Sequence, residues 1–105
     1  MGLQKFTVKD PDEILQYSFD FSLVMPDVTE TIVSTSWFVY AQADATNTHI
    51  TSMIVPDSSS NGARICSQYV KYGVSNTTYV LSCEVTTNKN EVIKLSGVLP
   101  VRTFR

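Results

Sequence analysis

Few residues of the chain could support catalysis, and His49 is the only histidine among them. A Ser-His-Asp or Cys-His site needs a histidine base that a carboxylate orients. Asp44 is close to His49 in sequence, but neither a nucleophile elbow nor an oxyanion-hole glycine accompanies them. We therefore expect His49 to be an ordinary strand or surface residue, and the sequence predicts that the protein is not an enzyme.

The two cysteines, Cys66 and Cys83, could form a metal site or a disulfide. Their spacing lacks the Cys-x-x-Cys pairs of a zinc site, and one histidine cannot complete a tetrahedral ligand set. Trp37 precedes both cysteines, whereas immunoglobulin domains place a core tryptophan between them. Because no secretion signal is visible, we expect two free thiols rather than a bridge. Cys83 shares a face with apolar residues, and Cys66, which alternates with Ile65, is expected to face outward.

Three carboxylates gather around Pro11, namely those of Asp10, Asp12 and Glu13. Carboxylate oxygens suit Ca²⁺, but their spacing is not that of an EF-hand loop. Asp10 precedes a proline, which is the arrangement of a capped first helical turn. We expect these carboxylates to cap a turn, and we expect no metal and no cofactor.

Composition restricts the classes of protein that the chain can belong to. It has 105 residues, a formal net charge of −2 and 17% charged residues. This length predicts one domain over residues 1–105. A nucleic-acid-binding domain would be basic, and a membrane-spanning helix would need a long apolar run. We therefore expect no nucleic-acid partner and no membrane partner.

The 12 Thr, 12 Ser and 13 Val residues, together with the aromatic ones, favour strands and turns. Residues 15–22 alternate apolar and polar side chains, which predicts a strand with one buried face. The segment 32–40 has large side chains on both faces, as in a central strand or in a strand whose outer face meets a partner. Its two faces are expected to carry Val33, Trp37 and Val39 on one side and Ile32, Phe38 and Tyr40 on the other. Further strands are predicted at residues 49–55, 63–72 and 78–87. Residues 92–99 and 101–104 are predicted to form one last strand or a pair of strands, with Pro100 bulging the strand or marking an edge.

This succession of short strands and turns predicts an all-β fold. We expect a single immunoglobulin-like β-sandwich of about seven antiparallel strands, with an extended N-terminal arm at residues 1–9. A small barrel is the main alternative.

The run at residues 9–22, Lys-Asp-Pro-Asp-Glu-Ile-Leu-Gln-Tyr-Ser-Phe-Asp-Phe-Ser, carries a resemblance that extends to residues 30–32 and 36–39. It resembles a family of small virion structural proteins of tailed bacteriophages, whose openings read Lys-Asp-Pro-Asp, a tyrosine and an Asp-aromatic-Ser step. Gln16 and Phe21 depart from the usual Asp and Trp, but both keep the alternation. The resemblance implies a non-enzymatic virion protein of the head or neck, either a capsid decoration protein or a collar and head-to-tail accessory.

Such a protein needs adhesive surfaces for repeated neighbours, and the sequence offers three. The N-terminal arm, with Phe6 and Val8, could add a strand to the sheet edge of a neighbour. The second surface is an apolar loop with Leu23, Val24 and Met25. The third is the two-sided strand at residues 32–40, with Trp37, Phe38 and Tyr40.

The resemblance implies partners among virion proteins, namely the major capsid protein, the portal or an adaptor, and a homo-oligomer in the particle. It implies assembly in the bacterial host cytoplasm and a location in the virion. The alternative hypothesis is a carbohydrate-binding β-sandwich of a tail fibre or baseplate, in which Trp37 and the five tyrosines would stack on sugars.

Overall fold

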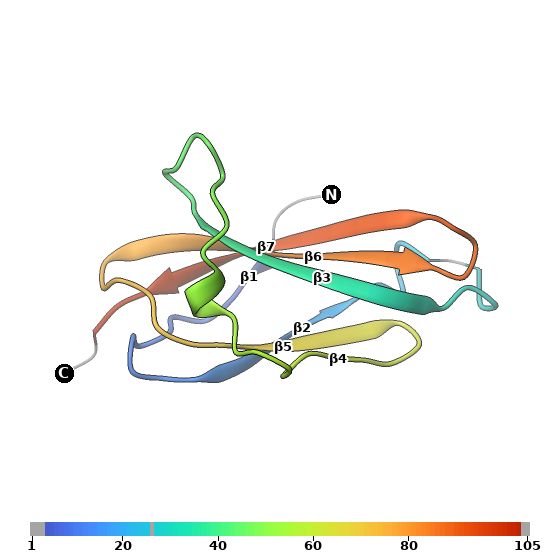
Figure 1. The fold of residues 1–105 in the computed structure, drawn as a ribbon, viewed down its shortest axis with the longest axis horizontal. Helices are drawn as coiled ribbons and strands as arrows, with labels where there is room; N and C mark the ends of the chain where they lie inside the picture. Colours follow the sequence, from blue (N-terminus) through green and yellow to red (C-terminus); the bar gives the residue numbers. More distant parts are fainter. Residues whose placement is uncertain (1–3, 26, 104–105) are drawn as a thin grey trace.

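A computed structural model describes residues 4–25 and 27–103, and these residues form two β-sheets packed face to face (Figure 1). The four-stranded sheet has the order β1 (Gln4–Lys5), β7 (Val92–Val101), β6 (Thr77–Thr87) and β3 (Ile32–Ala41). The three-stranded sheet has the order β2 (Leu15–Asp20), β5 (Ile65–Val70) and β4 (Ser60–Asn61). The prediction of an all-β sandwich is confirmed.

The core lies between the two sheets, because each long strand turns one row of apolar side chains inward. In β2, Tyr17 and Phe19 are buried while their neighbours in the strand are more exposed. In β6, Tyr79, Leu81 and Val85 are buried. Across residues 4–25 and 27–103, no helix is long and apolar enough to cross a membrane.

Strand β3 lies at the edge of its sheet and pairs only with β6 in it. The interpretation of this segment as a central strand is therefore wrong. After β3 the chain passes through a loop and continues in the other sheet, so no further strand among the described residues pairs with the free side of β3. The prediction of which faces Ile32 and Val33 occupy is also wrong. The register shifts between Ile32 and Ser34, so Val33 is an extra, bulged residue and is 62% exposed. The bulge lets Ile32 join Trp37 and Val39 in the core.

Two other segments differ from the prediction. Residues 49–55 do not form a strand. They contain a short 3₁₀ helix, η1 (Thr51–Met53), and one isolated bridge from Ile54 to Val70. Cys66 faces inward and is fully buried, while Ile65 is 49% exposed. The reason is the pairing with β2, which places Cys66 opposite Phe19 on the buried face of the sheet.

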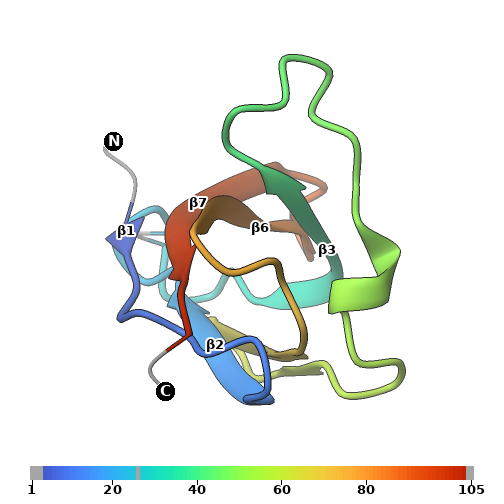
Figure 2. The same ribbon diagram turned by 90° about the vertical axis from the view of Figure 1, so that its left-hand side faces the viewer.

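The N-terminal arm lies along β7 of its own chain (Figure 2). β1 runs parallel to β7, with Gln4 opposite Gly97, and the backbone pairing resumes at Lys9, whose N–H donates to Pro100. Residues 1–3 of the predicted arm and Phe104 of the last predicted strand lie outside the described residues. β1 is thus one edge of the four-stranded sheet, and β3 is the other edge of that sheet.

Candidate functional site

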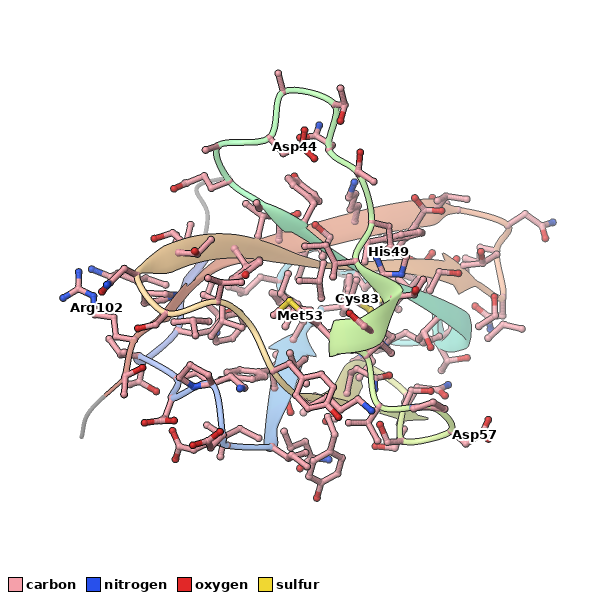
Figure 3. The ribbon with its side chains drawn as sticks, turned by 60° about the vertical axis from the view of Figure 1, so that its left-hand side comes forward. Asp44, His49, Met53, Asp57, Cys83 and Arg102 are labelled. Atoms are coloured by element: carbon pink, nitrogen blue, oxygen red, sulfur yellow. The ribbon has the colours of Figure 1, made fainter. Side chains whose placement is uncertain are left out.

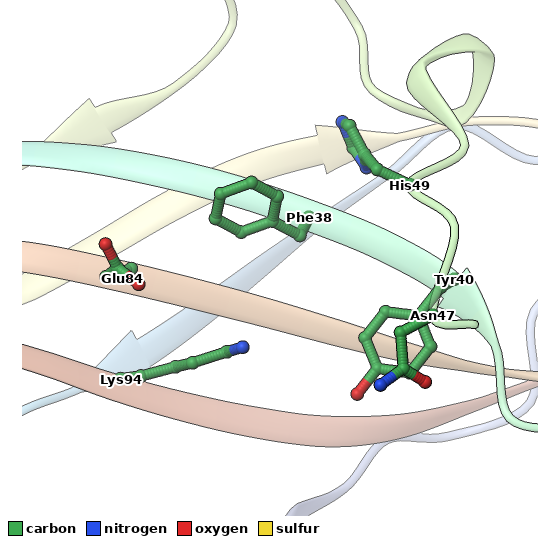
Figure 4. Close-up of a pocket in the computed structure, with 6 residues that line it drawn as sticks. All are labelled: Phe38, Tyr40, Asn47, His49, Glu84 and Lys94. Atoms are coloured by element: carbon green, nitrogen blue, oxygen red, sulfur yellow. The ribbon is translucent and has the colours of Figure 1, made fainter. Parts of the chain in front are cut away.

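The outer face of the four-stranded sheet has a pocket of about 190 Å³ beside β3 (Figure 4). It is lined by Phe38 and Tyr40 from β3, Glu84 from β6, Lys94 from β7, and Asn47 and His49 from the loop after β3. Two aromatic rings and four polar side chains therefore surround one depression. This arrangement can stack against a flat or aliphatic group and hydrogen-bond to its polar parts.

The loop at residues 42–50 projects from the sheet (Figures 1 and 3). Its residues Asn47 and His49 form one wall of the pocket. Asp44 fixes the shape of the loop. The carboxylate of Asp44 accepts hydrogen bonds from the hydroxyl of Thr46 (2.7 Å) and from the backbone N–H groups of Thr46 (2.9 Å) and Thr48 (3.1 Å). These bonds, with the Thr46 hydroxyl first, lower the pKa of Asp44. Asn47 adopts a positive φ of 51° at the tip, a conformation that asparagine tolerates well.

His49 joins this loop to the edge of β3. The backbone N–H of Val39 donates to Nδ1 of His49 at 3.0 Å, and the N–H of Ile50 donates to the Val39 carbonyl at 2.7 Å. An imidazole that accepts at Nδ1 carries its proton on Nε2. The His49 ring also stands edge-on to Phe38, with centroids 5.4 Å apart. His49 is thus a fixed part of the pocket wall.

Glu84 and Lys94 place opposite charges in the pocket. They are direct cross-strand partners on β6 and β7, yet no hydrogen bond or ion pair joins them in the described part of the chain. The Nζ of Lys94 lies 6.0 Å from the centroid of the Phe38 ring. The lining has no serine, threonine or cysteine beside His49, so it offers no nucleophile for that base to activate.

Of the three residues predicted on the two-sided strand, two reach this pocket. Phe38 and Tyr40 are half-buried on the outer face. Trp37 lies between the sheets and is only 8% exposed, because successive side chains of a strand point to opposite faces. Phe38 and Tyr40 therefore remain candidates for contact, and Trp37 serves the core.

The structure leaves the arm residues Phe6 and Val8 half-buried, and Phe6 packs against the core. The Phe6 ring lies 4.9 Å from the ring of Tyr17 and 5.6 Å from that of Phe19, in edge-to-face geometry. Tyr17 and Phe19 belong to the three-stranded sheet, whereas Phe6 follows β1 in the other one. Phe6 therefore closes one side of the sandwich.

The predicted apolar loop divides between core and surface. Met25 is fully buried, Val24 packs partly buried against the core, and Leu23 is 88% exposed. Val28, which the sequence reasoning did not single out, is 85% exposed in the same loop. Arg64 holds this loop through its guanidinium, which donates to the carbonyls of Met25, Asp27 and Glu30.

Two of the three carboxylates around Pro11, those of Asp10 and Glu13, cap a turn, as expected. Asp10 accepts a hydrogen bond from the N–H of Asp12 at 2.9 Å, and Glu13 accepts one from the N–H of Asp10 at 2.8 Å. Within the described ranges, no group of three or more His, Cys, Asp or Glu side chains could hold a metal ion.

Sequence reasoning missed four lining residues as a group, namely Asn47, His49, Glu84 and Lys94. No local pattern marks them, since they come from three separate segments. The pairing of Ser36 on β3 with Glu84, and of Glu84 with Lys94, brings the strands together. The hydrogen bonds of His49 and Ile50 with Val39 bring the loop to them. A correct strand alignment would have been the one available signal.

Comparison with known proteins gives a family. No curated protein matches the chain. A family model matches residues 9–100, which is most of the chain, and its description is that of a structural adaptor. The match identifies a tail-associated structural protein of the phage virion. The chain belongs to the family described as "Podophage GP4 fiber-tail adaptor protein gp77".

Proposed function

We propose that this chain is a non-enzymatic adaptor that connects a fibre to the tail of the phage particle by protein–protein contacts. The observation that carries the proposal is the match of an adaptor family over residues 9–100. The family description names fibre and tail, so we prefer this role to capsid decoration or a collar. It does not favour the alternative of a carbohydrate-binding module.

The shape of the molecule supports a connecting role. Its principal extents are 46 × 26 × 21 Å. A chain that joins two different structures needs two separated surfaces, and an elongated sandwich supplies them. One such surface is the exposed pair Leu23 and Val28 on the loop after β2. The other is the pocket around Phe38 and Tyr40 on the outer face of the four-stranded sheet.

We assign the pocket to a segment of the fibre protein. Half-buried aromatic rings with polar groups around them resemble the centres of protein interfaces. Phe38 and Tyr40 supply the apolar area, while Glu84 and Lys94 can each pair with a charge of opposite sign on the partner. Contacts with the major capsid protein or the portal, and a homo-oligomer in the particle, stay predictions that the family resemblance implies.

Binding measurements with the purified chain and the fibre and tail proteins of the same phage test the adaptor role. We expect the chain to bind both, and particles that lack it to lose their fibres. A chain that binds neither protein, in a phage whose particles keep fibres without it, would overturn the proposal.

A double substitution, Phe38→Ala with Tyr40→Ala, tests the assignment of the pocket. We expect it to weaken binding of the fibre protein by tenfold or more, which is typical for central aromatic residues. Tyr69→Ala is the matched control, because Tyr69 is 39% exposed on β5 in the other sheet. If both variants bind the fibre equally well, the pocket is not the fibre surface.

A further inference from the structure

The two cysteines meet across the interior of the sandwich. Cys66 lies on β5 of the three-stranded sheet and Cys83 on β6 of the four-stranded sheet. Both are free thiols and fully buried, and their Sγ atoms are 3.1 Å apart. Figure 3 shows the Cys83 side chain between the sheets. The sequence predicts that Cys83 lies on an apolar face and that Cys66 faces outward. The structure instead brings both thiols together between the sheets.

Strand pairing on both sides fixes this approach. Cys66 is the direct partner of Phe19, and Cys83 is the direct partner of Trp37. The rings of Phe19 and Trp37 lie 5.7 Å apart and bridge the sheets beside the sulfurs. A tryptophan therefore flanks the cysteine pair even though it precedes both cysteines in sequence. The proximity of the thiols results from the register of the two ladders.

Other uses of these thiols find no support in the part of the chain that the structure describes. No cluster of three metal-ligating side chains occurs there, so a zinc site lacks ligands. Both sulfurs are fully buried, whereas a reactive or catalytic cysteine needs access to its substrate. The remaining chemistry for two apposed thiols is oxidation to a disulfide.

We propose that Cys66 and Cys83 form a cross-linking site, which becomes an inter-sheet disulfide when the chain meets a low-molecular-weight disulfide oxidant outside the host cell. The host cytoplasm is reducing, so the thiols stay free during assembly. Released virions leave that compartment, and the chain is a virion protein. This inference does not depend on whether the chain connects fibre and tail.

With oxidised glutathione as the oxidant, the reaction proceeds in two exchanges. In attack by Cys66, its thiolate, formed by loss of a proton to solvent, attacks one glutathione sulfur, the glutathione disulfide breaks, and one glutathione leaves as a thiolate. Cys83 then gives its proton to that thiolate and attacks Cys66 Sγ, which releases the second glutathione as a thiolate that takes up a proton from solvent. The protein loses two hydrogen atoms, and the oxidant becomes two glutathione thiols.

The hydrogen bond between the sulfurs couples the ionisation of the two thiols, and burial raises the pKa of Cys83. Because both sulfurs are buried, the sheets must separate before glutathione can reach them, so we expect oxidation to be slow in the folded chain and fast in the unfolded one.

The test oxidises the full chain with oxidised glutathione in denaturant and then refolds it at low concentration. After treatment with a thiol-alkylating reagent, intact mass spectrometry counts the labelled cysteines. We expect an unlabelled monomer whose Tm exceeds that of the reduced chain by roughly 10 °C, since the bond closes a short loop. Reduction should restore both labels and the lower Tm. We also expect fluorescence of Trp37, the sole tryptophan, to differ between the two forms.

Two results would overturn the proposal. One is a chain that refolds only with both thiols labelled, or only as cross-linked dimers. The other is an oxidised monomer whose Tm equals or falls below that of the reduced chain. The double variant Cys66→Ala with Cys83→Ala is the control, and its Tm should not respond to oxidant or reductant. Cys66→Val with Cys83→Ala fills more of the space if the first variant does not fold.

Discussion

The Nζ atom of Lys9 donates a hydrogen bond of 2.8 Å to the backbone carbonyl of Tyr72, which lies 63 positions further along the chain. A second bond, of 2.9 Å, goes to the carbonyl of Asp10. Lys9 is fully buried, and Tyr72 adopts a positive φ of 63°. This lysine therefore ties the end of the N-terminal arm to the connection between β5 and β6.

Replacing Lys9 by Met should destabilise the protein by about 2 kcal/mol, because it leaves the buried carbonyl of Asp10 and the partly buried carbonyl of Tyr72 without their donor. The measurement is the free energy of unfolding in denaturant. Lys5→Met is the control, because Lys5 is exposed in β1, and it should change stability by less than about 0.5 kcal/mol. Equal effects of the two substitutions would show that the Lys9 bonds contribute nothing.

Gly97→Ala should displace the N-terminal arm from β7. A Cβ at Gly97 would lie 2.5 Å from Cε2 of Phe6 and 3.1 Å from the carbonyl of Gln4, both closer than ordinary contacts. We expect faster hydrogen exchange at Phe6 and a lower Tm. Gly62→Ala is the matched control, because a Cβ there meets only the Ile65 carbonyl at 3.7 Å. Unchanged protection at Phe6 would contradict this prediction.

Tyr17→Phe should stabilise the protein by about 1 kcal/mol. The hydroxyl of Tyr17 is buried and has no hydrogen-bond partner among the described residues. Removing it therefore removes the free-energy cost of burying an unpaired polar group. Denaturant unfolding at neutral pH measures the difference. A loss of stability would mean that the hydroxyl does have a partner in solution.

The same tyrosine predicts a pH dependence at alkaline pH. Burial, helped by the negative charge of Glu13, raises the pKa of Tyr17 from 10.0 to about 12. The folded state then binds more protons than the unfolded state between these values, so this contribution to stability is complete below pH 10 and is lost as pH rises toward 12. Tyr17→Phe should flatten this part of the stability curve.

Arg64→Ala should loosen the loop at residues 21–31 without unfolding the sandwich. Its guanidinium donates to three carbonyls of that loop, and a lysine cannot reproduce such a planar fork. We expect faster hydrogen exchange in residues 22–31 for both Arg64→Ala and Arg64→Lys. Arg102→Ala is the control, because Arg102 is exposed after β7. Restored protection in Arg64→Lys would mean that charge alone holds the loop.

Local pattern predicted the strands whose alternation is unbroken, such as Leu15–Asp20, where every second side chain is buried. It failed where one residue changes the phase, as the bulge at Val33 does, because a bulge depends on the partner strand. Cys66 was misplaced for a related reason, since its orientation follows from pairing with Phe19. The pocket was not predictable as a unit, because Glu84 and Lys94 reach it only through the register of separate strands.

The pairing of β1 with β7 also sets the order of events during synthesis. Gln4 pairs with Gly97, so the first described strand must wait for nearly the whole chain before it finds its partner. Contacts between such distant positions form late in folding, because a long loop must close first. The four-stranded sheet therefore cannot be completed on the ribosome while β7 is still in the exit tunnel. Each copy of the chain can therefore complete its fold for assembly only after translation of β7 ends.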